Sequence, residues 1–258
     1  MWLNLVAVSR VGATRGRLGD RTGLDARFAM AMKLVYVVFQ PIVSLRRRRV
    51  FGFEALLRSY EPTLPTACDV LKAAEQLGRL HDLGRAVRAR VADEAKRAPD
   101  GAKLFVNLHP VDLNDGDLYA AGSPLARIAS RVVLEITERA SLDSVKDVVL
   151  RMRELRAMGF QVALDDLGAG YAGLTSYSRL VPEIAKIDMS LVRGIDTDAR
   201  KRSIVGAMKR LCDELGTTAV AEGVETPGER DALVGLGYDL LQGDLFAKPA
   251  RGFSLHGW

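Results

Sequence analysis

Short apolar runs rich in β-branched residues alternate along the chain with longer segments in which apolar residues recur at helical spacing. The apolar runs are VYVVFQPIV at 35–43, VFGFEALL at 50–57, KLFVNL at 103–108, VVLEIT at 132–137, QVALDD at 161–166, EIAKID at 183–188, TAVAEG at 218–223 and YDLLQG at 238–243. The segments with helical spacing lie at 69–98, 143–159, 200–216 and 226–237. Strands that alternate with helices predict parallel β/α units.

Residues at the ends of the helical segments support these boundaries. Side chains suited to capping a first helical turn stand at Asp143, Asp198 and Thr226, and Pro227 suits a first helical position. Glycine suits the position after a helix because it adopts left-handed backbone angles without strain. Glycines stand at such positions at Gly159, Gly216 and Gly237.

Eight strands of this kind predict an α/β fold, a closed (β/α)8 barrel like the TIM barrel. The first two strands are joined only by four consecutive arginines at 46–49. A link this short cannot hold a crossover helix, so the two strands must pair antiparallel. We therefore expect a barrel whose first strand runs antiparallel to the rest.

The four arginines are also the densest charge run in the chain, and two interpretations stay open. The simpler one is a solvated hairpin turn, and the other is a patch for phosphate or nucleic acid. No aromatic residues interleave with the arginines, as a platform for single-stranded nucleic acid requires. We expect no nucleic-acid polymer as a partner. The net charge of +5 allows an anionic partner without demanding one.

Composition places the chain among ordinary globular proteins. It has 258 residues, of which 48% are hydrophobic and 27% charged. We interpret residues 1–25, with their scattered arginines and glycines, as a mobile tail, and residues 26–258 as the barrel. No apolar run reaches the roughly 20 residues of a membrane span, and the start does not read as a signal peptide. Cys68 and Cys212 are too few for a disulfide framework and fit a reducing, cytoplasmic location.

Polar side chains interrupt the apolar strands near their carboxyl ends. They are Glu54, Asn107, Glu135, Asp165, Asp166, Lys186, Asp188, Glu222 and Gln242. In a β/α barrel these strand ends converge on the face where active sites form. We therefore expect these side chains to lie around one site.

The residue types predict a site for hard divalent cations. Four or five carboxylates cannot all stay ionised at a dry rim unless cations balance them. The candidate ligands are oxygen atoms, which favour Mg²⁺ or Mn²⁺ over zinc or copper. The three histidines are His81, His109 and His256, and none belongs to a ligand pair. His109 lies closest, and we favour a structural role for it.

The adjacent pair Asp165 and Asp166 fits a site with two ions. One carboxylate can bridge two cations roughly 3.5–4 Å apart while its neighbour turns to the second cation. Gly168 and Gly170 give the following loop the freedom that this geometry needs. Two-metal oxygen sites are typical of phosphoester hydrolysis.

Seven motifs in this order resemble a known family. They are QPIV at 40–43 with FEALLR at 53–58, VNL at 106–108, LEITE at 134–138, ALDDLGAGY at 163–171, AKID at 185–188, AEGVET at 221–226, and QG at 242–243 with Pro249. This series resembles the EAL domains, bacterial cyclic di-GMP phosphodiesterases, from about residue 30 to residue 252. The resemblance implies metal-dependent hydrolysis of cyclic di-GMP to linear pGpG and a homodimer.

The resemblance also implies roles for individual residues. The first ion would be held by Glu54, Asn107, Glu135 and Asp165, and the second by Asp165, Asp166 and Glu222. The attacking water would lie near Lys186, with its activation assigned either to the metals or to Glu222. Substrate would be bound by Gln40, Leu56, Arg58, Asp188, Gln242 and Pro249, and Asp188 and Gln242 would also order the water and metals. The loop after Asp166 would be steadied by Glu138 and Glu225.

The loop after Asp166 departs from the family pattern Asp-Asp-Phe-Gly-Thr-Gly-Tyr-Ser-Ser. Leu167 replaces the phenylalanine, Ala169 the threonine, and Ala172-Gly173 the serine pair, while Asp244 stands where an aromatic residue is common. The lost hydroxyls could anchor this loop, so the departures bear on the rate and metal demand more than on the reaction type.

Two other functions stay open. One is an EAL domain that binds cyclic di-GMP or a protein partner without catalysis, although such domains usually lose metal ligands that are intact here. The other is an aldolase that forms a Schiff base through Lys186. The surrounding acids fit the aldolase poorly, because they would raise the pKa of the lysine.

Overall fold

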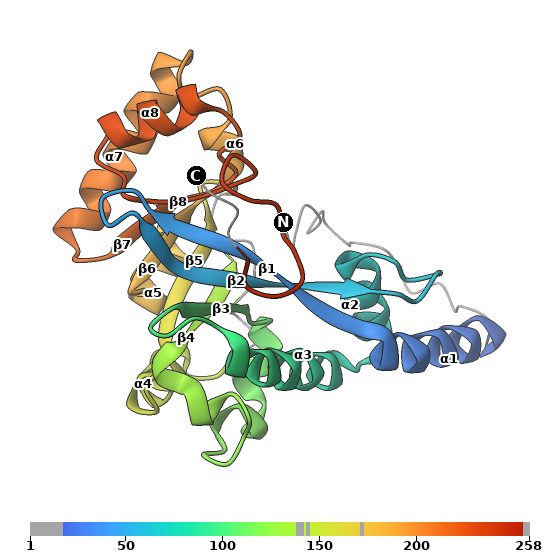
Figure 1. The fold of residues 1–258 in the computed structure, drawn as a ribbon. Coiled ribbons are helices and arrows are strands. Elements are labelled where there is room, and N and C mark those ends of the chain that lie inside the picture. Colours follow the sequence, from blue (N-terminus) through green and yellow to red (C-terminus); the bar gives the residue numbers. More distant parts are fainter. Residues whose placement is uncertain (1–17, 138–141, 143–144, 171–172, 255–258) are drawn as a thin grey trace.

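The computed structural model describes residues 18–137, 142, 145–170 and 173–254, and it shows a closed eight-stranded barrel (Figure 1). The strands are β1 (Val35–Ser44), β2 (Arg49–Ser59), β3 (Lys103–Asn107), β4 (Val132–Thr137), β5 (Gln161–Leu167), β6 (Ile184–Ile187), β7 (Thr218–Ala221) and β8 (Leu240–Gln242). β1 pairs antiparallel with both β2 and β8, and the other neighbours pair parallel. The predicted barrel with a reversed first strand is confirmed.

Helices surround the barrel and connect most of its strands. They are α1 (Leu18–Leu34), α2 (Ala67–Leu77), α3 (Leu80–Glu94), α4 (Val148–Ala157), α5 (Gly173–Leu180), α6 (Met189–Val192), α7 (Ala199–Glu214) and α8 (Pro227–Gly235). Four 3₁₀ segments are η1 (Ala95–Arg97), η2 (Pro110–Asn114), η3 (Gly116–Tyr119) and η4 (Ala126–Arg131). Among the described helices, none combines the length and apolar character that a bilayer crossing requires.

Two helical features differ from the sequence pattern. The segment 69–98 is not one helix, because Gly78 adopts a left-handed φ of 69° and ends α2 before α3 begins. Residues 18–25, predicted as part of the tail, belong to α1, while residues 1–17 lie outside the described residues.

The predicted caps are present where the structure describes them. The Asp198 side chain accepts hydrogen bonds from the backbone N–H groups of Arg200 and Lys201. Thr226 forms a reciprocal capping box with Glu229, and Pro227 follows as the first helical residue. Positive φ values occur at Gly159, Gly216 and Gly237. Asp143 lies outside the described residues.

The barrel interior has an apolar layer on which the polar side chains rest. Ile42, Phe105, Val133, Ala163, Ile184, Val220 and Leu240 form a buried cluster separate from the larger core beneath the helices. Side chains two residues apart on a strand point the same way. The residue two positions beyond each cluster member on β3 to β8 therefore also points inward, nearer the carboxyl ends of the strands. Those residues are Asn107, Glu135, Asp165, Lys186, Glu222 and Gln242.

The long β1–β2 hairpin extends beyond the barrel as a two-stranded ribbon beside α1, α2 and α3 (Figure 1). Gln40 pairs with Glu54, Val38 with Leu56, and Tyr36 with Arg58. Because paired residues share one face, a single face of the ribbon runs from Glu54 inside the barrel to Arg58 outside it.

Candidate functional site

Lys186 lies at the centre of the polar layer and is fully buried. Its ammonium nitrogen lies 3.2 Å from Glu54 Oε2, 2.6 Å from Glu135 Oε1, 3.0 Å from Asp165 Oδ1 and 2.5 Å from Glu222 Oε1. Burial opposes the charge on Lys186, but the four carboxylates outweigh it and raise the pKa of the ammonium well above its usual value. One lysine thus faces four acids, so positive charge is in short supply at this centre.

Glu54 is the best satisfied of these acids. Its Oε2 accepts a hydrogen bond from Gln242 Nε2 at 2.7 Å, and its Oε1 accepts one from Asn107 Nδ2 at 3.2 Å. The same Gln242 nitrogen lies 3.1 Å from Gln40 Oε1. Burial favours the protonated form of Glu54, but the Lys186 charge and the hydrogen bonds from Gln242 and Lys186 lower its pKa below the usual value. Glu54 therefore stays an ionised carboxylate.

Glu135 has the opposite environment. Both of its oxygen atoms are buried. Among the described residues neither accepts a hydrogen bond of good geometry, although Oε1 lies 2.6 Å from the Lys186 ammonium. Burial raises the pKa of Glu135 well above its usual value, with Glu54 and Asp165 adding to the shift. Oδ1 of Asp165 lies 3.0 Å from the same ammonium and, among the described residues, likewise accepts no hydrogen bond of good geometry. Carboxylate oxygens buried without donors are costly unless another cationic partner is bound.

Asp165, Asp166 and Glu222 form a second group of acids beside Lys186. One oxygen from each lies within 4.8 Å of the others, close enough to ligate one ion. Burial, followed by repulsion from Asp165, raises the pKa of Asp166 to about 7. Burial likewise raises the pKa of Glu222 to about 8, with Asp165 and Glu54 adding to the shift.

The backbone turns sharply at the Asp165–Asp166 pair. Asp166 adopts a left-handed φ of 57°, which is uncommon for a residue with a side chain. Gly168 follows with φ of 99°, and the N–H of Ala169 donates to the Asp166 carbonyl at 3.0 Å. This turn aims adjacent side chains in different directions. Ala172 lies outside the described residues, and Gly173 begins α5.

The oxygen-rich centre fits divalent cations better than a Schiff base. The donors are carboxylates and an amide, as Mg²⁺ and Mn²⁺ prefer. A lysine must lose its proton to attack a carbonyl, and the raised pKa of Lys186 opposes that loss. His109 accepts a hydrogen bond from the Val111 N–H at the start of η2, the structural role expected for it.

Comparison with known proteins identifies the family of this chain. Residues 25–249 match the family model described as the EAL domain. The chain belongs to the EAL domain family. It is 29% identical over 239 residues to a probable cyclic di-GMP phosphodiesterase, PdeN of Escherichia coli, with 89% of this chain and 46% of PdeN covered.

Two solved EAL-family structures share the fold. The MucR phosphodiesterase in complex with cyclic di-GMP superposes with a TM-score of 0.77 at 26% identity, covering 89% of this chain and 98% of that chain. Klebsiella pneumoniae BlrP1 in complex with calcium and cyclic di-GMP gives 0.75 at 29% identity, covering 95% of this chain and 69% of BlrP1.

The EAL domain is one part of many of these relatives. This chain spans 46% of PdeN and 29–31% of three other curated relatives.

The remaining candidate residues of this EAL domain lie at different depths. Leu56 is buried, and Arg58 is half-buried and donates to the Leu57 carbonyl at 2.8 Å. Pro249 is half-buried, next to the residue that bridges to β1. Asp188 is buried and caps α6 by accepting from the Ser190 N–H at 2.9 Å.

Of the two residues expected to steady the loop after Asp166, the structure describes one. Glu138 lies outside the described residues. Glu225 is exposed and forms a close ion pair with Arg193. Asp244 places a carboxylate oxygen 3.5 Å from Gln40 Nε2, at the rim of the centre.

Two contacts at the centre were missed from the sequence. The Thr137 hydroxyl lies 3.3 Å from Asp166 Oδ2 and donates to it, because parallel pairing places Thr137 beside Asp165. Arg193 reaches Glu225 from the segment after α6. Thr137 is the last residue of β4. A polar residue at the end of a predicted strand is the same sequence signal that identified the acids, and it could have identified Thr137.

Proposed function

We propose that this EAL domain hydrolyses one phosphodiester bond of cyclic di-GMP and releases linear pGpG, with two divalent cations per site. The observation that carries the proposal is the shortage of positive charge around Lys186. Four carboxylates share one ammonium, and among the described residues neither buried oxygen of Glu135 accepts a hydrogen bond of good geometry. Cations at this centre would satisfy these oxygens.

The arrangement of side chains suggests two groups of ligands. One ion would be held by Glu54, Asn107, Glu135 and Asp165, and the other by Asp165, Asp166 and Glu222, with Asp165 shared. When bound, Mg²⁺ or Mn²⁺ would lower the pKa of the attacking water and offset charge on the phosphoryl oxygens. The mutual approach of Asp165, Asp166 and Glu222 supports the second group.

Residues of this chain would orient the reaction around these ions. Lys186 would hold the attacking water while keeping Glu222 in place through their 2.5 Å contact. Glu222 would accept the proton from that water, unless bound cations would by themselves supply the acidity that the water needs. Gln242 and Asp188 would order the water and the ligands, since Gln242 donates to Glu54 and Asp188 lies near Asp166.

The ribbon formed by β1 and β2 would bind the substrate. Gln40, Leu56 and Arg58 share the face of the ribbon that starts at Glu54, and Arg58 would pair with a phosphate of the substrate. Pro249 would bound the same opening from the chain after β8. The solved complexes of MucR and BlrP1 with cyclic di-GMP support this class of substrate. A cytoplasmic homodimer is part of the same proposal.

Turnover by the purified chain tests the proposal. Cyclic di-GMP should be converted to pGpG with Mg²⁺ or Mn²⁺, and conversion should stop with a chelator and resume when the metal is restored. Ca²⁺ should bind but support little turnover, because it is larger and less demanding of geometry. Full activity after exhaustive chelation would contradict the two-ion site. Binding of cyclic di-GMP without turnover in any metal would instead identify a receptor.

A further inference from the structure

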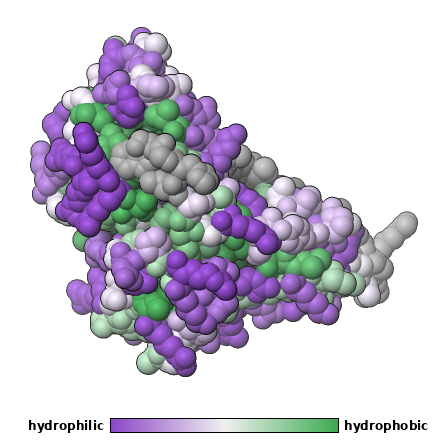
Figure 2. Space-filling model, in the orientation of Figure 1, coloured by the Kyte–Doolittle hydropathy of each residue, from purple (hydrophilic) through white to green (hydrophobic). Residues whose placement is uncertain are grey.

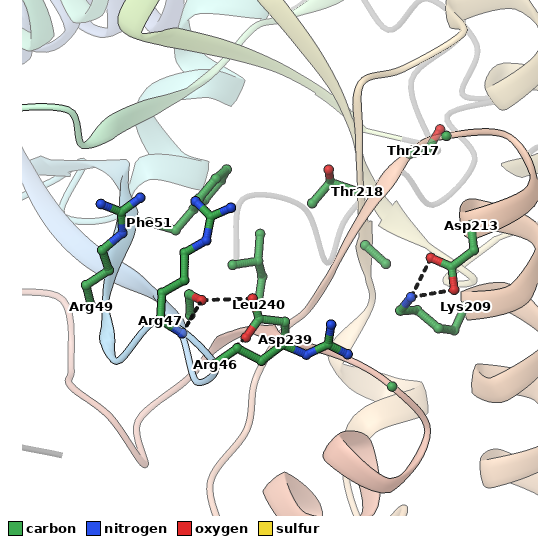
Figure 3. A pocket seen from close by; sticks show the side chains of 14 residues that line it. Arg46, Arg47, Arg49, Phe51, Lys209, Asp213, Thr217, Thr218, Asp239 and Leu240 are labelled. Carbon is green, nitrogen blue, oxygen red and sulfur yellow. Dashed lines mark hydrogen bonds and ion pairs between the residues drawn. The ribbon is translucent and has the colours of Figure 1, made fainter.

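A pocket of about 410 Å³ lies at the end of the barrel opposite the acidic centre (Figure 3). One wall is the turn between β1 and β2 with the start of β2. The other is the segment that joins α7 to β7, and Leu240 at the start of β8 lies between them. Leu240 belongs to the apolar layer of the barrel interior, so that layer separates the pocket from the acidic centre.

The pocket carries positive charge that the described protein does not balance. Arg46, Arg47 and Arg49 line it, and within the described part of the chain their guanidinium groups form no ion pair. Both carboxylates of the pocket have other partners. Asp239 accepts from the Ser44 hydroxyl at 2.8 Å and from the Arg46 backbone N–H at 2.7 Å, and Asp213 pairs with Lys209.

The arginine turn is held in one conformation by the loop before β8. Besides the two hydrogen bonds to the Asp239 side chain, the Leu45 N–H donates to the Asp239 carbonyl at 3.1 Å. Within the turn, the Arg47 N–H donates to Ser44 Oγ at 3.2 Å. The anchoring lowers the entropy cost of presenting the guanidinium groups to a ligand.

The walls of the pocket differ in character. Figure 3 shows the guanidinium groups of Arg47 and Arg49 on either side of Phe51, while Arg46 extends toward the wall that carries Lys209 and Asp213. Phe51 packs partly against the apolar layer and is half-buried. Figure 2 shows hydrophilic side chains on the surface at the end of the molecule where this turn lies.

We propose that this pocket binds a small molecule that carries two or more phosphate groups and an aromatic part, the chemistry of a nucleoside polyphosphate. Guanidinium groups match phosphate oxygens with paired, charge-assisted hydrogen bonds. The volume lies within the roughly 300–1,000 Å³ of small-molecule sites, and a single phosphate would not fill it. Phe51 and Leu240 supply apolar surface for a base. The site is separate from the proposed hydrolysis and does not depend on it.

Calorimetric titration of the full chain tests this site. ATP and GTP are the probes, with tripolyphosphate and adenosine as partial ligands, all in EDTA so that no cations draw phosphates to the acidic centre. Both nucleotides should bind, tripolyphosphate should bind more weakly, and adenosine should show no binding. Arg47→Gln and Arg49→Gln should each raise the Kd for ATP about tenfold or more, since a charge-assisted contact is lost.

Arg48→Gln is the matched control. Arg48 lies in the same turn but does not line the pocket, so its loss changes net charge equally and should change the Kd less than about twofold. Equal weakening by Arg48→Gln would show diffuse attraction and overturn the site. So would the absence of nucleotide binding at millimolar concentration, or tripolyphosphate binding as tightly as ATP. Binding of an oligonucleotide but not ATP would indicate a nucleic-acid surface instead.

Discussion

Glu54 and Glu135 show how neighbouring acids in one barrel acquire different properties. Both are buried beside Lys186, yet Gln242 and Asn107 donate to Glu54, while the cation that approaches Glu135 among the described residues is Lys186 itself. The pKa of Glu54 is accordingly lowered and that of Glu135 raised. Both acids are fully buried, so the difference lies in their other contacts. The Lys186 charge and the Gln242 donor lower the pKa of Glu54, whereas repulsion from Glu54 and Asp165 adds to the burial that raises the pKa of Glu135. Bound cations would favour the ionised form of both.

The first prediction concerns Glu54. Glu54→Ala should lower the turnover of cyclic di-GMP more than about 100-fold, because even the outer partners of metal ligands contribute 10–100-fold. Binding need not be lost, because Arg58 and the second group of acids remain. Product analysis checks the rate, with Glu214→Ala at the exposed carboxyl end of α7 as a matched control that keeps activity. A Glu54→Ala variant at the wild-type rate would show that the ligand assignment is wrong.

The second prediction concerns pH. Glu222 has a pKa of about 8 in the folded chain and an ordinary value of 4.5, so the folded state holds a proton that the unfolded state releases between these values. Its contribution to stability therefore falls as pH rises through this window. In EDTA, the Tm of the wild type should fall more steeply between about pH 5 and pH 8 than that of Glu222→Gln. Equal slopes in thermal unfolding would exclude this titration.

At the scale of elements, the apolar layer holds the polar layer in place. Gly52 of β2 leaves room for it, since a Cβ there would lie 2.8 Å from Phe105 Cε2 and 2.7 Å from the Lys103 carbonyl oxygen. Phe105 fills the space that Gly52 leaves and supports the base of the acidic centre.

Gly52→Ala should therefore destabilise the fold by about 1–3 kcal/mol through overpacking. Gly23→Ala is the control, because its Cβ would meet nothing within 4 Å and alanine is favoured over glycine within α1. It should be neutral or stabilising. Urea unfolding measures both free energies, and equal effects of the two substitutions would contradict tight packing at Gly52.

The loop after β5 carries the fourth prediction. Ala169 stands where the family has threonine, and its N–H donates to the Asp166 carbonyl in a tight turn. A hydroxyl at position 169 could hold one conformation of this turn and keep Asp166 aimed at its ion. Ala169→Thr should raise the rate, or lower the metal concentration for half-maximal activity, by up to about tenfold, the worth of one hydrogen bond.

Glu138 is the proposed partner of that hydroxyl, so Glu138→Ala should erase the benefit in a double-mutant cycle. Turnover across a Mn²⁺ titration, measured for the wild type, the two single variants and the double variant, tests this coupling. If Ala169→Thr leaves both rate and metal dependence unchanged, other contacts already order the loop.

At the scale of the molecule, strand order and direction followed from the sequence because apolar runs and link lengths are local features. The short arginine link alone required an antiparallel β1. The break in the segment 69–98 was missed because apolar spacing continues across Gly78, whose left-handed backbone is visible only in the structure. Helix α1 was missed because it depends on contacts with distant residues, such as Arg79 over the Phe28 ring.

The candidate site was predicted from strand ends, and its internal contacts were not. Convergence of the carboxyl ends placed Glu54, Glu135 and Lys186 together without knowledge of any distance. The contact between Thr137 and Asp166 depends on the register of β4 against β5, which no local pattern encodes. The unequal hydrogen bonding of Glu54 and Glu135 likewise arises only when the barrel closes.

The central claim is that the acids around Lys186 hold two divalent cations. Anomalous diffraction from crystals of this chain grown with Mn²⁺ tests it most directly. The account predicts two peaks, one among Glu54, Glu135 and Asp165 and one among Asp165, Asp166 and Glu222. The cluster of His81, Asp112 and Asp115, away from Lys186, should stay without metal, because Arg85 and Arg88 already pair with its acids. Peaks only at the His81 cluster, or no peak at all, would contradict the account.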